Sequence, residues 1–586
     1  MSSDIISLYR SRLAREKGTV VKDRGGKLAV ALAYPNTYRL GMSNLGYQYV
    51  YHLLNRRPDV VAERVFLPES QEMALYLQSG KPLLSLESQA PVHDFDVVAF
   101  SLSFENDYLH VLKILELAKI PLLAEKRSKS CPYVMAGGVT TFMNPEPLAP
   151  FMDFFLPGEA EAVLDEFLDH FLSYGNVHRS RSDILRDLCR NMSSVYVPSF
   201  YHTEYHRDGT IRSFLPTRDH VPERIKIARS TAEQIPASGI TTPDTEFGGK
   251  VLIELGRGCT RSCRFCAAGY VYRPPRIPDE TTTRLAIEEA LQISRNLGLI
   301  APAISDIPGI EDLASLILDN GGRFSVSSLR ADSLTPRLLD HLHRAGQRTI
   351  TIAPEAGSER LRRVINKHLT RSQIADAAKR LACTHAFAVR LYFLVGLPTE
   401  TRQDIREILE LVKTVKHHMI RESAPRGTIG QIRLSVNCFV PKPFTPFQWV
   451  PLEQISSLKE KQKWLKKNLG REGGVRINFD VPKWAYVQAL LSMGDRRVSA
   501  MLLRAHEQNG NWTQALRFSD VNPDFFVYRP RGTDEILPWD FVDHGISKKH
   551  LLREYALAIR GEQSDICHVG ECYRCGVCVP AKPDGR

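Results

Sequence analysis

Short apolar runs alternate with helical patterns through the first 195 residues of the chain. The runs that predict strands cover residues 28–34, 96–101, 132–136 and 153–157. Apolar residues at helical spacing cover residues 46–54 and 106–120. Such alternation predicts a doubly wound α/β fold with a parallel sheet. Gly137, Gly138 and Gly158 follow predicted strands, at the sheet edge where these folds bind ligands, although tight turns are an alternative explanation for Gly137 and Gly138.

Strand and helix patterns also alternate farther along the chain. Strands are expected over residues 251–255, 299–304, 324–328, 348–353, 389–396 and 431–439. Six β/α units of this kind fit a partial (β/α)6 barrel. Before them lies a connector with a hairpin that turns at Asp208-Gly209, and after them comes a mainly helical region with a cysteine-rich tail. We therefore expect four segments, at residues 1–195, 196–246, 247–440 and 441–586.

The composition is typical of a globular protein in a reducing compartment. Hydrophobic residues make up 43% of the 586 residues, and no apolar run approaches the ~18 residues that a membrane span needs. The N-terminus lacks the apolar core of a signal peptide. Eleven cysteines are too few for a disulfide scaffold, and seven of them fall into two tight groups, which favours metal binding. We expect a cytoplasmic protein with no membrane partner.

The net charge of +11 permits an anionic partner such as RNA but does not establish one. The most basic stretch, residues 459–467, has apolar residues at helical spacing. It is therefore expected to be the solvated face of a packed helix.

Three cysteines, Cys259, Cys263 and Cys266, form a C-x3-C-x2-C motif directly after the predicted strand 251–255. A thiolate-rich loop suits iron–sulfur clusters and zinc. A structural zinc site needs four protein ligands, and no further Cys or His lies close by in the sequence. A cubane cluster held by three thiolates would instead leave one iron open. The loop follows the C-terminal end of a strand, where barrel enzymes place their active sites.

This spacing, with the aromatic Phe265 before the last cysteine, resembles the signature of the radical S-adenosylmethionine (SAM) enzymes. The resemblance implies that the three cysteines hold a [4Fe–4S] cluster whose open iron binds SAM. An electron from a reducing donor such as flavodoxin or ferredoxin then cleaves SAM to methionine and a 5′-deoxyadenosyl radical. That radical abstracts hydrogen from a substrate, so the implied activity is C–H functionalisation. The sequence does not indicate a catalytic residue or the substrate.

The resemblance also implies that strand ends of the barrel contact SAM. The candidates are Ser327, Ser328 and Arg330 after the third strand, Glu355 after the fourth and Gly396 after the fifth. We expect Arg330 to bind the carboxylate and Glu355 the ribose or the amine. Surface ion pairs are the alternative for both, with Arg360 or Arg362 as partners of Glu355. The family's Gly-Gly-Glu motif for the amine is not visible, and Ser305-Asp306 stands in its place.

The first 195 residues resemble the cobalamin-binding domain that precedes many radical SAM cores. The Ala-Gly-Gly-Val and Pro-Gly-Glu-Ala-Glu runs after two predicted strands carry this resemblance. The D-x-H-x-x-G motif that supplies a histidine to cobalt is absent, so the resemblance leaves open whether cobalamin is bound. Only Cys131 and Cys189 lie in this region, whereas a methylthiotransferase would need a cysteine trio there.

The C-terminal tail contains Cys567, Cys572, Cys575 and Cys578 in the pattern C-x4-C-x2-C-x2-C. This pattern resembles the cysteine run of bacterial ferredoxins and indicates a second iron–sulfur cluster or a structural zinc site, with redox or free thiols as a further alternative. The four remaining cysteines are isolated and are expected in the core; they are Cys131, Cys189, Cys383 and Cys438.

The sequence thus predicts a radical SAM enzyme that carries out C–H functionalisation, with cobalamin-dependent methyl transfer as the leading form. An RNA-modifying radical SAM enzyme is the alternative, and a non-catalytic iron–sulfur or zinc scaffold or sensor is a third hypothesis. These differ in their expected behaviour, since only the enzymes cleave SAM and only the RNA enzyme binds RNA with strong salt dependence.

Overall fold

The computed structural model describes residues 2–174, 180–231 and 233–578. The first part of the chain forms a five-stranded sheet in the order β2-β1-β3-β4-β5, in which all neighbouring strands are parallel. The strands are β1 (Leu28–Tyr34), β2 (Val60–Phe66), β3 (Val97–Ser101), β4 (Tyr133–Gly137) and β5 (Phe154–Phe155). The helices are α1 (Ser2–Leu13), α2 (Tyr38–Gly41), α3 (Leu45–Arg56), α4 (Ser70–Ser79), α5 (Tyr108–Leu117), α6 (Val139–Met143), α7 (Ala160–Ser173) and α8 (Arg181–Asn191).

The central part of the chain forms a partial barrel of parallel strands. A three-stranded sheet, β11-β10-β9, and a four-stranded sheet, β12-β13-β14-β15, meet at a parallel bridge between Leu329 and Ile352. The strands are β9 (Val251–Glu254), β10 (Asn296–Ile300), β11 (Arg323–Val326), β12 (Thr349–Glu355), β13 (Ala388–Val395), β14 (Ile432–Cys438) and β15 (Val475–Phe479). The helices along them are α9 (Ala268–Val271), α10 (Glu280–Ile293), α11 (Ile310–Asp319), α12 (Pro336–Arg344), α13 (Glu359–Val364), α14 (Arg371–Thr384), α15 (Arg402–Ser423) and α16 (Ile455–Leu469).

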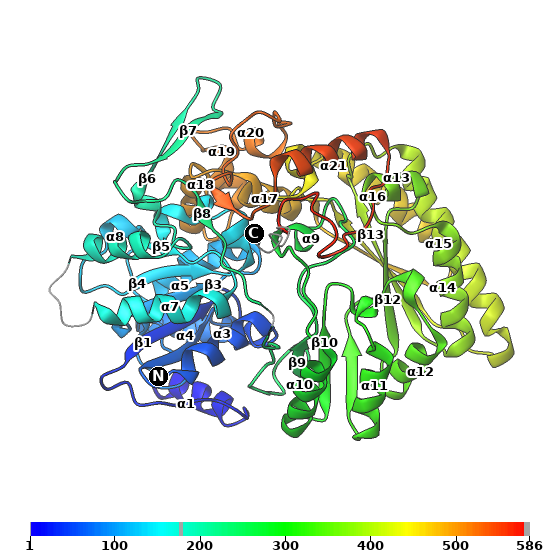
Figure 1. Cartoon of the computed structure of the whole chain (residues 1–586), viewed down its shortest axis with the longest axis horizontal. Coiled ribbons are helices and arrows are strands. Elements are labelled where there is room, and N and C mark those ends of the chain that lie inside the picture. Colours follow the sequence, from blue (N-terminus) through cyan, green and yellow to red (C-terminus); the bar gives the residue numbers. More distant parts are fainter. Residues whose placement is uncertain (1, 175–179, 232, 579–586) are drawn as a thin grey trace, which may run out of the picture.

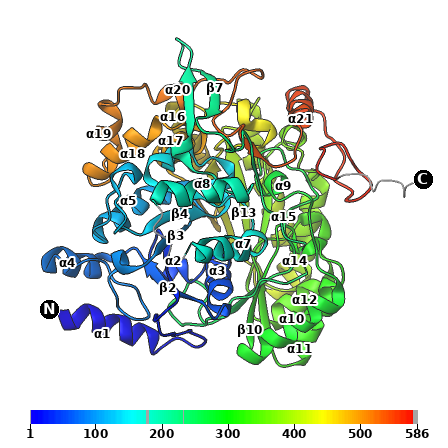
Figure 2. The same ribbon diagram turned by 60° about the vertical axis from the view of Figure 1, so that its left-hand side comes forward.

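The remaining elements join these two parts. The hairpin of β6 (Tyr201–Tyr205) and β7 (Ile211–Pro216) turns at Asp208-Gly209, as expected. Strand β8 (Ile225–Lys226) pairs with β16 (Val542–Asp543), so the connector and the C-terminal region share a small sheet. The last helices are α17 (Pro482–Met493), α18 (Val498–Glu507), α19 (Trp512–Arg517), α20 (Asp524–Val527) and α21 (Lys548–Arg560). Figure 1 shows the first sheet on the left, the barrel on the right, and α17 to α20 above the first sheet. Figure 2 shows α21 and the tail at one side of the molecule.

Local sequence explains why these elements form. All seven residues of β1 are buried, because the strand lies between two neighbours and is covered on both faces. Helix α15 begins with a capping box, in which the Thr401 hydroxyl accepts the Asp404 N–H and the Asp404 carboxylate accepts the Thr401 N–H. The parallel sheets with helices along them confirm the α/β fold class expected from the sequence.

Several details of the sequence analysis need correction. The second barrel strand covers Asn296–Ile300 instead of 299–304. Strands β2 and β15 were not expected, and β15 pairs with β14 from within the region predicted to be mainly helical. The Cys383 thiol is exposed on α14 and Cys131 is partly exposed, whereas Cys189 and Cys438 are buried as expected. The four segment boundaries stay predictions.

The basic stretch lies on α16, with Leu458, Leu465 and Leu469 buried beneath its solvated face as the sequence indicated. In the parts of the chain that the structure describes, no helix has both the length and the apolar character needed to cross a bilayer.

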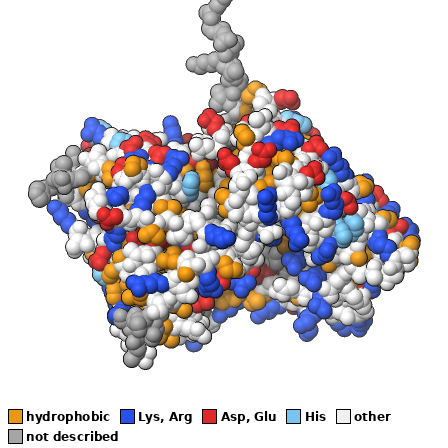
Figure 3. Space-filling view, turned by 90° about the horizontal axis from the view of Figure 1, so that it is seen from below, with side chains coloured by type: hydrophobic (Ala, Val, Ile, Leu, Met, Phe, Trp, Pro, Cys, Tyr) orange, Lys and Arg blue, Asp and Glu red, His pale blue; other side chains and the backbone are white. Residues whose placement is uncertain are grey.

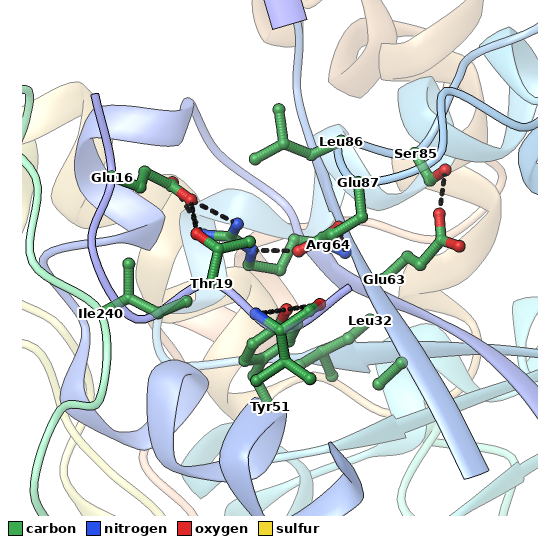
Figure 4. A network of polar contacts seen from close by, with 12 residues as sticks. Glu16, Thr19, Leu32, Tyr51, Glu63, Arg64, Ser85, Leu86, Glu87 and Ile240 are labelled. Carbon is green, nitrogen blue, oxygen red and sulfur yellow. Dashed lines mark hydrogen bonds and ion pairs between the residues drawn. The ribbon is translucent and has the colours of Figure 1, made fainter. Parts of the chain in front are cut away.

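A buried ion-pair network ties the N-terminal segment to the first sheet (Figure 4). The Arg64 side chain of β2 is fully buried and donates to Glu16 through both terminal nitrogens, at 2.9 and 2.6 Å. Its Nε donates to Glu87 at 2.6 Å. Tyr38 and Thr19 also donate to Glu16. The network therefore places one cation between two carboxylates in the interior, an arrangement that is tolerated only when all partners are present.

Candidate active site at the barrel mouth

The three cysteines lie on the loop that follows β9, at the C-terminal end of the strand. Gly258 precedes Cys259 with φ of 78°, and a Cβ there would lie 2.6 Å from the Tyr272 carbonyl oxygen. Arg257 and Arg276 form an antiparallel bridge beneath it. Only glycine fits this turn, because the backbone is left-handed and closely approached. The loop is thus shaped by its glycine before any ligand binds.

The thiols of Cys259, Cys263 and Cys266 lie within electrostatic range of one another and are only partly exposed. Burial, and then the neighbouring thiols Cys263 and Cys259, raise the pKa of Cys266 to about 12. Within the described residues, no three Cys, His, Asp or Glu side chains converge as they would on a single metal ion. A cubane needs no such convergence, since its thiolates bind different iron atoms. Sulfur ligands concentrated in a sheltered loop fit an iron–sulfur cluster.

Three ion pairs surround the cysteine loop. Arg261 of the loop pairs with Asp306 through two hydrogen bonds of 2.7 and 2.8 Å. Arg330 pairs with Asp332 at 2.8 Å and donates to the His368 carbonyl at 3.4 Å. Glu355 pairs with Lys367 at 3.2 Å. Cationic and anionic groups therefore alternate around the loop, as recognition of a zwitterion requires.

The structure places the residues predicted to contact SAM near the cysteine loop, but their ion-pair partners differ from those expected. The partner of Glu355 is Lys367, which the sequence analysis missed, and neither Arg360 nor Arg362. Arg330 does form an ion pair, but that pair lies beside the cysteine loop. Asp306 faces Arg261, so the position of the missing Gly-Gly-Glu motif is occupied by a residue that holds the loop.

The other candidates for contacts with SAM are Ser327, Ser328 and Gly396, and they differ in exposure and packing. Ser327 is exposed and Ser328 is partly buried, just beyond the end of β11. Gly396 has φ of 86°, its N–H donates to Glu400 at 3.0 Å, and a Cβ would lie 2.9 Å from Leu458. The packing of α16 therefore already explains the glycine at position 396. Contacts of these residues with SAM stay predictions.

Strained backbone is concentrated around the cysteine loop. Ten described non-glycine residues have positive φ, and four of them, Ser262, Glu355, Asn366 and His368, belong to this neighbourhood. Asn366 Nδ2 donates to the Ser262 carbonyl at 3.3 Å, and the His368 carbonyl accepts from Arg330 at 3.4 Å. Residues held in sparsely populated conformations cluster at functional sites, where the surrounding structure sustains them.

The cysteine-rich tail lies against the same loop. Arg264, fully buried between Cys263 and Phe265, donates to the Glu562 carbonyl at 2.8 Å and to Glu554 at 3.1 Å. The Cys567 N–H donates to the Thr260 carbonyl at 2.8 Å. The structure therefore brings together two cysteine groups that are about 300 residues apart in the chain.

A cavity of about 490 Å³ separates the first sheet from the barrel mouth. Its inner wall consists of apolar residues of the sheet and of α3 and α7. Its polar lining includes Ser101 at the end of β3, Ser103 just beyond it, and Ser43 and Asn44 at the start of α3. On the barrel side it is lined by Glu254, Arg257, Tyr272 and Ile300. The volume is in the range of small-molecule sites.

Strand order explains where this cavity lies. The order β2-β1-β3-β4-β5 reverses direction between β1 and β3, and parallel sheets bind ligands at this switch point. Gly138 and Gly158 line this cavity and are also closely approached by backbone, since Cβ atoms there would lie 2.4 Å from the Leu102 carbonyl oxygen and 2.7 Å from the Ala228 backbone. Both residues have positive φ, so a tight turn accounts for Gly138, and its contact with a ligand stays a prediction.

The fold and the loop define an iron–sulfur enzyme of the barrel type, and comparison with known proteins identifies its family. Residues 253–412 match the radical SAM superfamily, and residues 46–198 match the N-terminal region described for radical SAM proteins. A relative from Methanocaldococcus jannaschii, described as uncharacterized protein MJ0966, is 31% identical over 476 residues, which is 81% of this chain and 90% of the relative. The chain belongs to the radical SAM superfamily, whose cofactors are a [4Fe–4S] cluster and SAM.

Two other matches are more distant. The tRNA-2-methylthio-N(6)-dimethylallyladenosine synthase of Bordetella parapertussis is 22% identical over 228 residues, or 34% of this chain and 47% of that protein. The chain thus spans about half the length of that relative. The structure of the radical SAM methyltransferase TsrM from Kitasatospora setae, with cobalamin and a [4Fe–4S] cluster bound, has a TM-score of 0.45 at 12% identity, over 83% of this chain and 97% of TsrM.

Proposed function

We propose that this radical SAM enzyme uses cobalamin and transfers a methyl group to an unactivated C–H position of its substrate. The observation that carries the proposal is the cavity that runs from the switch point of the first sheet to the cysteine loop. Its walls include Glu254 and Arg257 directly before that loop and Tyr272 just after it. A ligand in this cavity would adjoin the SAM site.

The chemistry of the walls suits a large amphipathic cofactor. Cobalamin has a rim of amide side chains and an apolar aromatic base, and when bound it supplies a methyl group that can be transferred. The side chains that offer hydrogen bonds to these amides are Ser101 and Ser103 at the end of β3, and Ser43 and Asn44 at the start of α3. The apolar slot beneath them, between the sheet and α3 and α7, suits an aromatic base. No histidine occurs among the described residues that line the cavity.

Ion pairs at the junction would hold the two cofactor sites together. Arg257 pairs with Glu254 and Glu161 at 2.6 Å and with Glu159 at 3.0 Å. Arg276 pairs with Glu159 at 2.5 Å. These pairs are mostly buried and connect the start of α7 to the cysteine loop. They support a fixed distance between the sheet that would bind cobalamin and the loop that binds the cluster.

At the SAM site, we assign the methionine carboxylate to Arg330, which would exchange its bond to Asp332 for the ligand. Glu355, held by Lys367, would accept hydrogen bonds from the ribose or the amine. The positive φ of Glu355 supports this role, because strain of this kind is retained where a side chain must be aimed. Ser327 and Ser328 would complete the contacts at the neighbouring strand end.

A cavity-filling substitution tests the cobalamin proposal. Ser103→Trp places an indole at the cavity rim and is expected to lower cobalt bound per chain more than about tenfold, which corresponds to 1.4 kcal/mol of binding free energy. Iron and sulfide per chain should stay unchanged, because the cysteine loop is not altered. Cobalt and iron are measured after anaerobic incubation with hydroxocobalamin. Ser128→Trp, an exposed position of the same region outside the cavity, is the matched control. Equal cobalt in the two variants, or none in the unmodified protein, would contradict the proposal.

Modification of RNA is the second candidate function. The net charge of +11 and the distant tRNA-modifying relative favour it. Figure 3 shows Lys and Arg side chains on both halves of the face seen from below, with Asp and Glu among them. If RNA is the substrate, affinity for tRNA should fall at least about tenfold between 50 and 200 mM salt, since each phosphate contact releases counterions. Filter binding across salt concentrations measures this, and affinity that does not depend on salt would exclude RNA.

The enzyme needs a one-electron reductant, and we propose a protein donor of the flavodoxin or ferredoxin class. We also propose a cytoplasmic location. All eleven cysteines lie in the described residues and none is in a disulfide, which suits a reducing compartment.

A further inference from the structure

The tail after α21 is attached to the cysteine loop by a dense set of hydrogen bonds. Ser564 lies at its centre, where its N–H donates to Asn366 at 3.0 Å and its hydroxyl donates to Glu554 at 2.8 Å. Asn366 in turn contacts the Ser262 carbonyl, and Arg264 contacts the Glu562 carbonyl. Because Arg264 and Asn366 are both fully buried, the tail is part of the packed structure at this point.

The four tail cysteines lie together beyond this attachment. All four come from one stretch of twelve residues, Cys567 to Cys578. Cys575 is buried, with 4% of its surface exposed, and its carbonyl accepts the Ser547 N–H at 2.8 Å. The other three are partly exposed. The four thiols are therefore close in sequence and partly sheltered, although no three of these described side chains converge as they would on a single metal ion.

A buried side chain connects the cysteine loop to the helix from which the tail continues. Arg273 donates to the Ser262 hydroxyl at 2.7 Å and to the Gly269 carbonyl at 2.7 Å, on the loop that carries Cys263 and Cys266. Its Nη1 lies 3.4 Å from Nε2 of His550 on α21. The tail, red in Figure 1, lies beside α9. With the bond from Cys567 to Thr260, this makes the two groups direct neighbours.

We propose that Cys567, Cys572, Cys575 and Cys578 bind a second iron–sulfur cluster, which passes electrons from a protein donor to the SAM-binding cluster. Three cysteines with the spacing C-x2-C-x2-C are typical ligands of a cubane cluster. Structural zinc sites more often combine two ligand pairs from separate arms. A second redox centre also explains why the tail is attached to the SAM cluster loop, whereas a stabilising zinc would need no such neighbour.

The relay role rests on the proposed function, and its electrons balance without a further reactant. A reduced flavodoxin or ferredoxin gives one electron to the tail cluster and is itself oxidised by one electron. The tail cluster returns to its oxidised state when it reduces the SAM-binding cluster, and that electron is consumed in the reductive cleavage of SAM.

The outer face of the tail suits such a donor. Val569 and Tyr573 are exposed hydrophobic residues beside the tail cysteines, with 46% and 45% of their surface accessible. Helix α21 and the tail also expose basic residues, namely Lys548, Lys549, Arg553 and Arg574, and the tail exposes the acidic residues Asp565 and Glu571. An exposed apolar patch on a segment with charges of both signs offers a contact surface for a protein donor.

Metal analysis of the full-length protein tests the site without any need for activity. Purified and reconstituted without oxygen, the chain should hold about eight irons, four in each cubane. The core variant, with Cys259, Cys263 and Cys266 changed to Ala, should keep about four, as should the tail variant C572A/C575A. One zinc and only about four irons in the unmodified protein, or no iron in the core variant, would overturn the proposal. The core variant keeps the tail unchanged, so the result stands even if the tail variant folds poorly.

A comparison of reductants tests the relay. The rate of 5′-deoxyadenosine formation with reduced flavodoxin is divided by the rate with dithionite, a small reductant that can reach the SAM-binding cluster directly. In the tail variant this ratio should fall more than about tenfold, an effect that simple loss of stability would not produce. An unchanged ratio would exclude the relay. If the unmodified protein cleaved SAM with neither reductant, the enzymatic function would be contradicted. The iron and zinc content would then be the test of the tail site.

Discussion

Alanine in place of Cys263 is expected to abolish the reductive cleavage of SAM. Cys263 is the middle residue of the proposed ligand trio, and the next residue, Arg264, anchors the loop by donating to the Val364 carbonyl. With two thiolates left, two irons would lack a protein ligand, so the cluster would no longer present one unique iron to SAM. Loss of a residue that only supports a metal ligand lowers affinity or activity about 10- to 100-fold. Loss of the ligand itself should therefore exceed about 100-fold, measured as 5′-deoxyadenosine formed with dithionite.

The exposed thiol of Cys383 provides the matched control. It lies on α14, away from both cysteine groups, and contacts Glu422 at 3.6 Å. Cys383→Ala removes the same chemical group from the chain and should leave SAM cleavage and iron content within about twofold. Cleavage by the Cys263 variant at the rate of the Cys383 variant would contradict the assignment of the cluster ligands.

The elements that could be predicted from the sequence are those with an unbroken apolar run. Strand β1 has no charged residue, and its predicted and observed bounds coincide at residues 28–34. Strand β2 was missed because Glu63 and Arg64 interrupt its apolar pattern. Both side chains are buried, and only partners distant in the sequence compensate them. Strand β10 was placed three residues too late because it begins with the exposed polar residue Asn296.

At the candidate site, too, local motifs could be recognised in the sequence, whereas contacts between distant residues could not. The cysteine trio is visible in the sequence because its three thiols lie on one short loop, so local spacing carries the signal. The role of Lys367 could not be predicted from the sequence, because Lys367 follows Glu355 by twelve residues and reaches it only through the turn after α13. The contact of Arg273 with His550 is set by how α21 packs, which no local pattern encodes. Sequence therefore predicted the metal chemistry, and tertiary structure was needed to show the residues around it.

Methionine in place of Arg64 is expected to cause the largest loss of stability among the substitutions considered. The change leaves Glu16 and Glu87 as two carboxylates in the interior without their cation (Figure 4). Breaking a buried ion pair by removing one partner costs about 3–5 kcal/mol, because the remaining charge is uncompensated. The N-terminal segment, which Glu16 holds against β2, should detach first. Hydrogen exchange of the β1 and β2 amides measures this local loss, which is preferable to a global unfolding curve in a chain of this size.

Two further variants separate charge compensation from packing. Arg56→Met breaks the exposed pair between Arg56 of α3 and Asp165 of α7 and should cost less than about 1 kcal/mol, as surface pairs do. The triple variant with Glu16→Gln, Arg64→Met and Glu87→Gln removes all three charges and should recover part of the loss, since no buried charge remains. Equal exchange rates in the Arg64 and Arg56 variants would show that Arg64 contributes no more than a surface pair. Recovery in the triple variant would show that the N-terminal segment depends on charge balance around Arg64.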